Sequence, residues 1–332
     1  MMKRKVNFSV CITLSLFLLF LPVYGQQSGD QPCFKQRPAL VFPGALRATM
    51  LGAAQAGQRI VAVGDHGVVL LSDDQGKTFR QAKAVPTRVT LNAVSFANDK
   101  EGWAVGHLGV VLHTVDGGET WVMQRDDLSS DRPLFTVWFR GNALGFAGGL
   151  WGLLLKTTNG GTSWEEVKLP VTQGSKKAEK NLFALFSNKK GDLFIAAERG
   201  TVFKSADGGQ TWKEIATGIP ATLWTGVALK SGTLIVAGLR GRIMRSEDGG
   251  EHWIEVNSGT KSSITGITEL TNGRILAVGL DGVSLQSSDD GRNFSVSSRP
   301  DRMALTAVVS SAQRDIPVVF SENGPVGPVA VK

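Results

Sequence analysis

The chain has 332 residues, of which 42% are hydrophobic and 20% charged, and its formal net charge is +7 at pH 7. It has no concentrated basic run, so this small excess of positive charge argues against a nucleic-acid-binding protein. It has two cysteines, Cys11 and Cys33. These numbers exclude a disulfide framework and a cysteine-held metal centre, and we predict no cofactor and no metal.

Residues 1–25 have the pattern of a signal peptide: basic residues at positions 3–5, an apolar run over 10–21, and a cleavage site with small residues at positions 23–25. The run is too short to span a bilayer, which makes a transmembrane anchor the weaker alternative. Cleavage after Gly25 would remove Cys11 and three positive charges, lowering +7 to +4. We therefore predict an exported protein, periplasmic or secreted, or lumenal if its source is photosynthetic. Residues 26–38 are expected to be a flexible lead-in, and residues 39–332 a single domain.

One motif recurs along residues 39–332: Ser/Thr-x-Asp-x-Gly-x-Thr followed by an aromatic residue. We call its copies the aspartate turns; they are Ser72–Phe79, Thr114–Trp121, Thr157–Trp164, Ser205–Trp212, Ser246–Trp253 and Ser287–Phe294. A turn glycine precedes each copy, and a seventh glycine, a weaker match, follows the last copy. The seven are Gly67, Gly109, Gly152, Gly200, Gly241, Gly282 and, as the weaker match, Gly324. A period of about forty residues indicates a repeat architecture.

Each repeat contains several short apolar runs rich in Val, Ile and Leu, which are typical of strands buried on both faces. In the first repeat, residues 60–64 and 68–71 flank the turn at Gly67. A further strand precedes each such pair, at residues 91–96, 134–139, 182–186, 223–229, 264–270 and 305–310. With the strand after the aspartate turn, each unit has four strands. This count predicts an all-β propeller of four-stranded blades.

The aspartate turns are predicted to be structural. The hydroxyl and carboxylate groups of such a turn can bond to backbone groups of the turn itself, and its glycine permits positive φ. The aromatic residue places a large ring between neighbouring hairpins. The acceptor residues are Asp74, Asp116, Asn159, Asp207, Asp248 and Asp289.

The seventh unit, residues 305–332, ends before an aspartate turn can form. An open sheet edge invites aggregation, so we expect the missing strand to be supplied from elsewhere. The apolar run Ala39–Phe42 precedes the first unit. We predict seven blades, with Ala39–Phe42 completing the last one; six blades is the alternative.

The turns are similar to the bacterial neuraminidase repeat. More specifically, Gly102–Gly109 running into Thr114–Trp121 resembles the photosystem II stability and assembly factor family. This resemblance implies a seven-bladed propeller that binds a photosystem II subunit during assembly through arginines on one face. It also implies related exported proteins in bacteria without photosynthesis.

A sialidase or other glycan-active propeller is the main alternative function. Sialidases with this repeat use a tyrosine nucleophile, but the one tyrosine here is Tyr24, in the predicted signal peptide. Asp65, Glu198 and Asp281 are predicted to occupy equivalent turn positions facing one rim and could supply a carboxylate pair, although solvated loop charges are the favoured interpretation. The repeat also places His66 and His107 in equivalent turns of adjacent blades, but no third ligand recurs, so we predict no metal site.

We predict that the second-to-third-strand turns share one face with the connections between blades. On this face, arginines could dock an acidic loop or terminus of a membrane-protein complex, because guanidinium groups engage carboxylates bidentately. An exposed tryptophan would add an anchor, and the polar connection over residues 171–180 could add contacts. Ordinary solubilising charges are an equally good interpretation. The candidate residues are Arg88, Arg132, Trp151, Arg199, Arg240 and Arg302.

Overall fold

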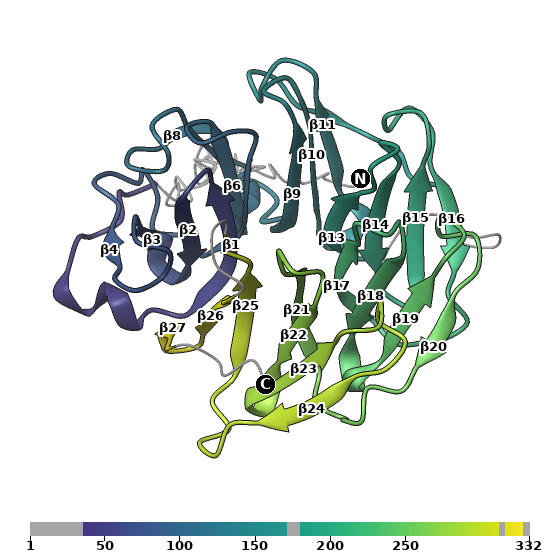
Figure 1. Cartoon of the computed structure of the whole chain (residues 1–332). Helices are drawn as coiled ribbons and strands as arrows, with labels where there is room; N and C mark the ends of the chain where they lie inside the picture. Colours follow the sequence, from purple (N-terminus) through teal and green to yellow (C-terminus); the bar gives the residue numbers. More distant parts are fainter. Residues whose placement is uncertain (1–35, 171–179, 312–315, 328–332) are drawn as a thin grey trace, which may run out of the picture. The chain divides into compact units, whose positions relative to one another are not determined.

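The computed structural model describes residues 36–170, 180–311 and 316–327. In it, seven antiparallel sheets are arranged around a common centre (Figure 1). The chain is thus a seven-bladed β-propeller, as predicted from the repeat. Among these residues no α-helix is present, and nothing helical is long and apolar enough to cross a bilayer. The predicted signal peptide and Cys33 lie outside the described residues.

Six blades have four strands each, hydrogen-bonded in sequence order from the innermost strand outwards. The strands of blades 1–3 are β1 (Met50–Ala56), β2 (Arg59–Gly64), β3 (Val69–Ser72), β4 (Arg80–Gln81), β5 (Leu91–Phe96), β6 (Gly102–Gly106), β7 (Val111–Thr114), β8 (Val122–Arg125), β9 (Leu134–Arg140), β10 (Leu144–Gly149), β11 (Leu154–Thr157) and β12 (Glu165–Glu166). Those of blades 4–6 are β13 (Leu182–Ser187), β14 (Leu193–Ala197), β15 (Thr201–Ser205), β16 (Lys213–Ala216), β17 (Leu223–Ala228), β18 (Leu234–Gly238), β19 (Ile243–Ser246), β20 (Ile254–Val256), β21 (Ile264–Glu269), β22 (Ile275–Gly279), β23 (Val283–Ser287) and β24 (Ser295–Ser298).

Blade 7 has three strands among the described residues: β25 (Leu305–Val309), β26 (Val318–Ser321) and β27 (Gly324–Val326). Short 3-10 turns are η1 (Pro43–Arg47), η2 (Asp65–Gly67), η3 (His107–Gly109), η4 (Leu150–Gly152), η5 (Leu239–Gly241) and η6 (Leu280–Gly282).

The core is divided among the interfaces between neighbouring blades. The second strand of each blade is almost fully buried, because it lies mid-sheet between two neighbouring sheets. Each of the seven interfaces has its own apolar cluster, for example Trp103 of blade 2 with Leu134 and Phe139 of blade 3. Trp103 stacks on Phe139 with ring centroids 3.5 Å apart. Burial of these runs is the main favourable term that holds the ring together.

The predicted completion of blade 7 by Ala39–Phe42 is wrong. These residues form no strand and instead lie along blade 1: Ala39 N donates to Val85 O, and Phe42 N donates to Gln81 Oε1. Prolines at positions 38 and 43 flank the run and have no N–H, so a strand ladder could not continue past either end. The run therefore adds no strand to blade 7, which has three within residues 305–311 and 316–327.

The ring is closed instead by the same kind of interface that joins the other blades. Strand β25 lies beside β1 (Figure 1), and Met50, Ile60 and Phe320 belong to one buried cluster. Thr306 Oγ1 of blade 7 donates to Met50 O. Closure therefore needs no strand exchanged between the two ends of the chain.

Each aspartate turn is closed by its own side chains. In the first copy, Ser72 Oγ donates to Asp74 Oδ1 at 2.8 Å and accepts from Gly76 N at 2.7 Å, while Thr78 N donates to Asp74 Oδ1 at 2.9 Å. The other copies repeat this pattern, and Asn159 accepts the same backbone bond from Ser163 in blade 3. The bonds from Thr78 lower the pKa of Asp74 to about 2. The turn thus supplies bonds that the strands cannot supply there.

Replacing one of these acceptors should destabilise the protein modestly. Asp116→Ala removes bonds from Thr114 Oγ1 (2.8 Å), Thr120 N (2.9 Å) and Thr120 Oγ1 (2.6 Å). We expect a loss of about 1–2 kcal/mol in the free energy of unfolding, measured with denaturant. Asp116→Asn is the control, because Asn159 shows that an amide can accept the backbone bond; it should lose less than half as much. Equal losses for the two variants would contradict this role.

Candidate functional site

The site is built on the face that carries the turns between second and third strands, which we call the turn face. Each of these turns lies between the connection that enters its blade and the connection that leaves it. In blade 5, Leu239 N donates to Thr222 O of the entering connection, and Arg240 N donates to Ser263 Oγ of the leaving one. The turns and the blade-to-blade connections therefore share one face, as the geometry of the repeat predicts.

One position in these turns holds a non-glycine residue with positive φ in six successive blades. Its φ lies between 54° and 59°, a region that costs a residue with a side chain about 1–2 kcal/mol. The next residue is a glycine in every case. The backbone of the turn is thus repeated, while the side chain it presents differs between blades. The six residues are His66, Leu108, Trp151, Arg199, Arg240 and Asp281.

Three adjacent blades carry a candidate residue at this turn position. Trp151 in blade 3 is 63% exposed, and Arg199 and Arg240 follow in blades 4 and 5 as exposed residues. Neither arginine forms an ion pair with a described residue. The structure therefore places Trp151, Arg199 and Arg240 on one side of the turn face, each available for a partner.

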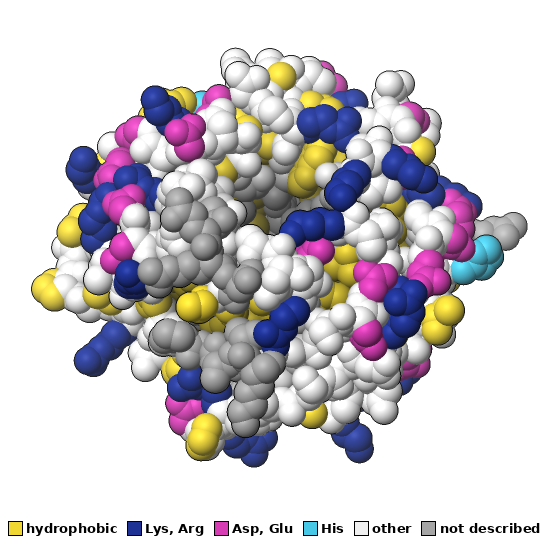
Figure 2. All heavy atoms as spheres, viewed as in Figure 1, with side chains coloured by type: hydrophobic (Ala, Val, Ile, Leu, Met, Phe, Trp, Pro, Cys, Tyr) yellow, Lys and Arg dark blue, Asp and Glu magenta, His cyan; other side chains and the backbone are white. Residues whose placement is uncertain are grey.

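The other three predicted arginines already have partners. Arg88 Nε donates to Pro38 O at 2.7 Å, and Arg302 Nη2 pairs with Asp281 Oδ1 at 3.1 Å. Arg132 Nη1 lies 3.4 Å from a carboxylate oxygen of Glu166. These contacts reduce their capacity for a further carboxylate. On the face seen in Figure 2, basic and acidic side chains are interspersed in the same way.

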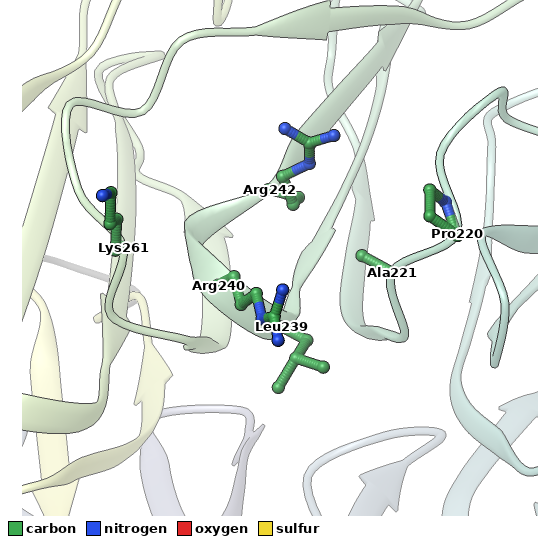
Figure 3. A pocket seen from close by; sticks show the side chains of 6 residues that line it. All are labelled: Pro220, Ala221, Leu239, Arg240, Arg242 and Lys261. Atoms are coloured by element: carbon green, nitrogen blue, oxygen red, sulfur yellow. The ribbon is translucent and has the colours of Figure 1, made fainter.

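A pocket of about 800 Å³ lies at the turn of blade 5. Figure 3 shows this turn, with Leu239 and Arg240, between Lys261 on one side and Pro220 and Ala221 on the other. The pocket combines apolar walls from the connection into blade 5 with cations from the turn and the connection out of it.

The charges around the pocket are unbalanced. Arg242 Nη1 pairs with Glu255 Oε1 at 2.7 Å, whereas Arg240 and Lys261 have no acidic partner among the described residues. Two free cations beside apolar walls suit a carboxylate carried by an apolar chain. Lysines 176 and 177, in the polar connection over residues 171–180, lie outside the described residues.

The predicted carboxylate alternative is corrected in one respect. Asp281 occupies the positive-φ position of its turn. Asp65 and Glu198 each lie one residue before that position in their own turns, so the three residues are not equivalent. Each carboxylate is also occupied: Asp65 accepts from Thr90, Glu198 from Asn181, and Asp281 from Ser262 and Arg302.

The histidine pair is offset by one residue in the same way. His66 occupies the positive-φ position of its turn, and His107 lies one residue before Leu108, which occupies that position in the next blade. In the described part of the chain, no group of three or more His, Cys, Asp or Glu residues could hold a metal ion.

Residues 81–213 match the family described as photosynthesis system II assembly factor YCF48. This region resembles the photosystem II assembly factors. A curated relative, photosystem II assembly lipoprotein Ycf48 of Picosynechococcus sp., is 40% identical over 134 residues. The match spans 40% of this chain and 38% of that relative.

Solved structures of the assembly factors share the fold. The one described as YCF48 bound to D1 peptide has a TM-score of 0.69 at 18% identity, and covers 90% of this chain and 98% of that one. YCF48 from Cyanidioschyzon merolae has a TM-score of 0.64 at 16% identity, over 88% and 97% of the two chains. Virginiamycin B lyase from Staphylococcus aureus scores 0.72 at 11% identity, over 89% and 98%. At these identities the likeness concerns the fold, and the fold occurs in both a binding protein and a lyase.

Sequence reasoning missed the apolar part of the site. Pro220 and Ala221 lie in a short connection whose place in the pocket depends on its contact with the preceding turn, where Gly200 N donates to Ala221 O. Leu239 precedes the arginine of its turn and lines the pocket. Aligning the turns residue by residue would have drawn attention to Leu239, but no pattern in the sequence marks the connection.

Proposed function

We propose that this chain is an exported, non-enzymatic binding protein that holds an acidic loop or terminus of a protein partner on its turn face. The partner class is a membrane-associated complex under assembly, photosystem II where the source is photosynthetic. The observation that carries the proposal is the row of Trp151, Arg199 and Arg240 on three adjacent blades, with both arginines free of acidic neighbours among the described residues. Unpaired guanidinium groups are strong ligands for carboxylates.

The relatives support the same function. The matched family is one of assembly factors, and one structure of similar fold holds a peptide of D1. Export is supported by the sequence pattern of residues 1–25. Binding is favoured over sialidase-type catalysis because residues 26–332 contain no tyrosine and the three rim carboxylates are engaged by structural partners.

Charge reversal on the turn face tests the proposal. We expect Arg199→Glu with Arg240→Glu to weaken binding of a synthetic glutamate-rich peptide at least about tenfold, because two attractive contacts become repulsive. The measurement is isothermal titration calorimetry at one fixed salt concentration. Thermal stability should stay within a few degrees of the unmodified protein, since both side chains are exposed.

The matched control reverses two charges elsewhere. Lys77 and Lys100 are exposed and lie in the turns at the opposite ends of the strands. Lys77→Glu with Lys100→Glu changes the net charge by the same amount and should leave affinity within about twofold. Equal losses in the two double variants would show that net charge, and no site on the turn face, governs binding.

A further inference from the structure

The innermost strand of every blade contains an irregularity at the same place. Pairing with the second strand skips one residue in each case, for example Phe183 between Leu182 and Ala184, whose partners Ala197 and Ala196 are consecutive. A bulge of this kind leaves one residue unpaired and re-aims its side chain. The seven residues, which we call the bulge residues, are Leu51, Asn92, Phe135, Phe183, Trp224, Thr265 and Thr306.

Polar bulge residues join neighbouring blades. Asn92 Nδ2 donates to Leu134 O at 2.8 Å, and Thr265 Oγ1 donates to Leu305 O at 2.7 Å. Thr306 Oγ1 donates to Met50 O. In all three the acceptor is the first residue of the next blade's innermost strand, so the structural task of a polar side chain here is to bond to the next blade.

Blades 3, 4 and 5 carry aromatic residues at this position instead. Phe135 and Phe183 stack with ring centroids 5.4 Å apart and an interplanar angle of 13°, and the side chain of phenylalanine cannot make the bond to the next blade. Phe135, Phe183 and Trp224 are all partly exposed. Three consecutive blades thus replace a polar position with apolar surface that solvent can reach. In the view of Figure 2, hydrophobic side chains border the central hollow, with basic side chains close by.

The aromatic bulge residues lie at the same end of their blades as the candidate site. Leu223 pairs with Gly238, two residues before Arg240, and this places Trp224 at the turn end of blade 5. The pairing of Leu182 with Ala197 does the same for Phe183 and the turn of Arg199. In blade 3, Leu134 pairs with Gly149, two residues before Trp151, and this places Phe135 at the turn end as well. Blades 4 and 5 therefore combine aromatic surface with a free arginine at the turn end, and blade 3 adds a second aromatic residue, Trp151.

We infer that Phe135, Phe183 and Trp224 form an apolar subsite for an extended peptide that carries an aromatic or large aliphatic side chain close to its carboxylates. This inference rests on the proposed function and specifies the chemistry of the partner segment. Aromatic faces bind apolar side chains by area burial and ring stacking, while Arg199 and Arg240 engage the acidic groups. A single-stranded nucleic acid would also use rings and cations, but the interspersed acids of this mildly basic chain disfavour it.

The test compares two synthetic peptides of equal length and equal glutamate content, one with a phenylalanine where the other has a serine. Calorimetry on the unmodified protein should show about tenfold tighter binding of the phenylalanine peptide. Phe183→Thr with Trp224→Thr should abolish that preference while both peptides still bind through the arginines. Threonine is the residue of blades 6 and 7 at this position, so it can bond to the next blade and preserve stability.

Asn92→Thr is the matched control, because it changes the bulge residue of blade 2 outside the aromatic segment; it should keep the tenfold preference. If the double variant unfolds, Trp224→Thr alone makes the same comparison, with a smaller loss of preference expected. Binding of both peptides with equal affinity by the unmodified protein would overturn the inference and leave the proposed function standing. Binding of neither peptide would overturn both, and tighter binding of oligothymidine than of either peptide would overturn the assignment to a peptide.

Discussion

Gly209→Ala should lower the free energy of unfolding by about 3 kcal/mol. Gly209 lies in the aspartate turn of blade 4 with φ +78°, and an added Cβ would lie 2.1 Å from Phe146 Cζ of blade 3. Phe146 is fully buried and packs edge-on against Trp212, so it has little room to move. Backbone strain contributes about 1–2 kcal/mol and forced overpacking about 1–3 kcal/mol. The measurement is equilibrium unfolding in denaturant.

The preceding residue provides the control. Gly208 has φ +72°, and an added Cβ would meet nothing within 4 Å. Gly208→Ala therefore carries the backbone strain without the collision, and we expect a loss of about 1 kcal/mol. The difference between the two variants measures the packing between blades 3 and 4. Equal losses in the two variants would mean that Gly209 is required only for its backbone conformation, and that its packing against Phe146 does not affect stability.

The two glycines also show what the repeat pattern reveals and what it hides. From the sequence, the doubled glycine predicts a tight turn with positive φ, and this is the conformation of both residues. The collision with Phe146 is invisible in the sequence, because it arises only when one blade is packed on the one before. The same relation recurs elsewhere: a Cβ on Gly76 of blade 1 would meet Val318 of blade 7. The aspartate turn of each blade is therefore also a contact with the preceding blade.

Blade count and blade closure differ in how much the sequence reveals. The period and the buried strand pairs predict seven blades, because burial on both faces leaves a strong apolar pattern. Closure was mispredicted because Ala39–Phe42 has the composition of a strand, whereas its amide hydrogen bonds go to Val85 and Gln81 of the first repeat region. The apolar composition of the run does not record which segment accepts these hydrogen bonds.

The candidate site was predicted only in part for a similar reason. The position of an arginine in the turn motif places Arg199 and Arg240 on the turn face directly. Whether an arginine is free depends on neighbours from other segments, as Arg302 with Asp281 and Arg132 with Glu166 show. The aromatic bulge residues follow the first residue of each innermost strand, so a strand-by-strand alignment of the repeats would have revealed them.

Arg245→Met should destabilise the protein by about 3 kcal/mol, although methionine keeps most of the apolar stem. Arg245 in β19 is buried, and its guanidinium pairs with Glu247 at 2.7 Å and with Asp290 at 2.8 Å, linking blades 5 and 6. Asp290 has φ +64° and stands where four other aspartate turns have glycine. Its carboxylate also accepts from Ser231 and Thr233. Removing the arginine leaves a partly buried carboxylate without its cation, which is the costly way to break such a pair.

Adding Asp290→Gly to Arg245→Met should recover most of the stability that Arg245→Met loses. It removes the unpaired carboxylate and relieves the positive φ, so Arg245→Met with Asp290→Gly is expected within about 1 kcal/mol of the unmodified protein. Lys213→Met is the surface control: its ammonium pairs with Glu251 at 2.8 Å but is 66% exposed, and its loss should stay below about 1 kcal/mol. Denaturant unfolding of the unmodified protein, the single variants Arg245→Met and Asp290→Gly, and the double variant gives the coupling energy. Additive losses in the double variant would show that Arg245 acts through packing alone, and that the ion pair between blades 5 and 6 contributes nothing.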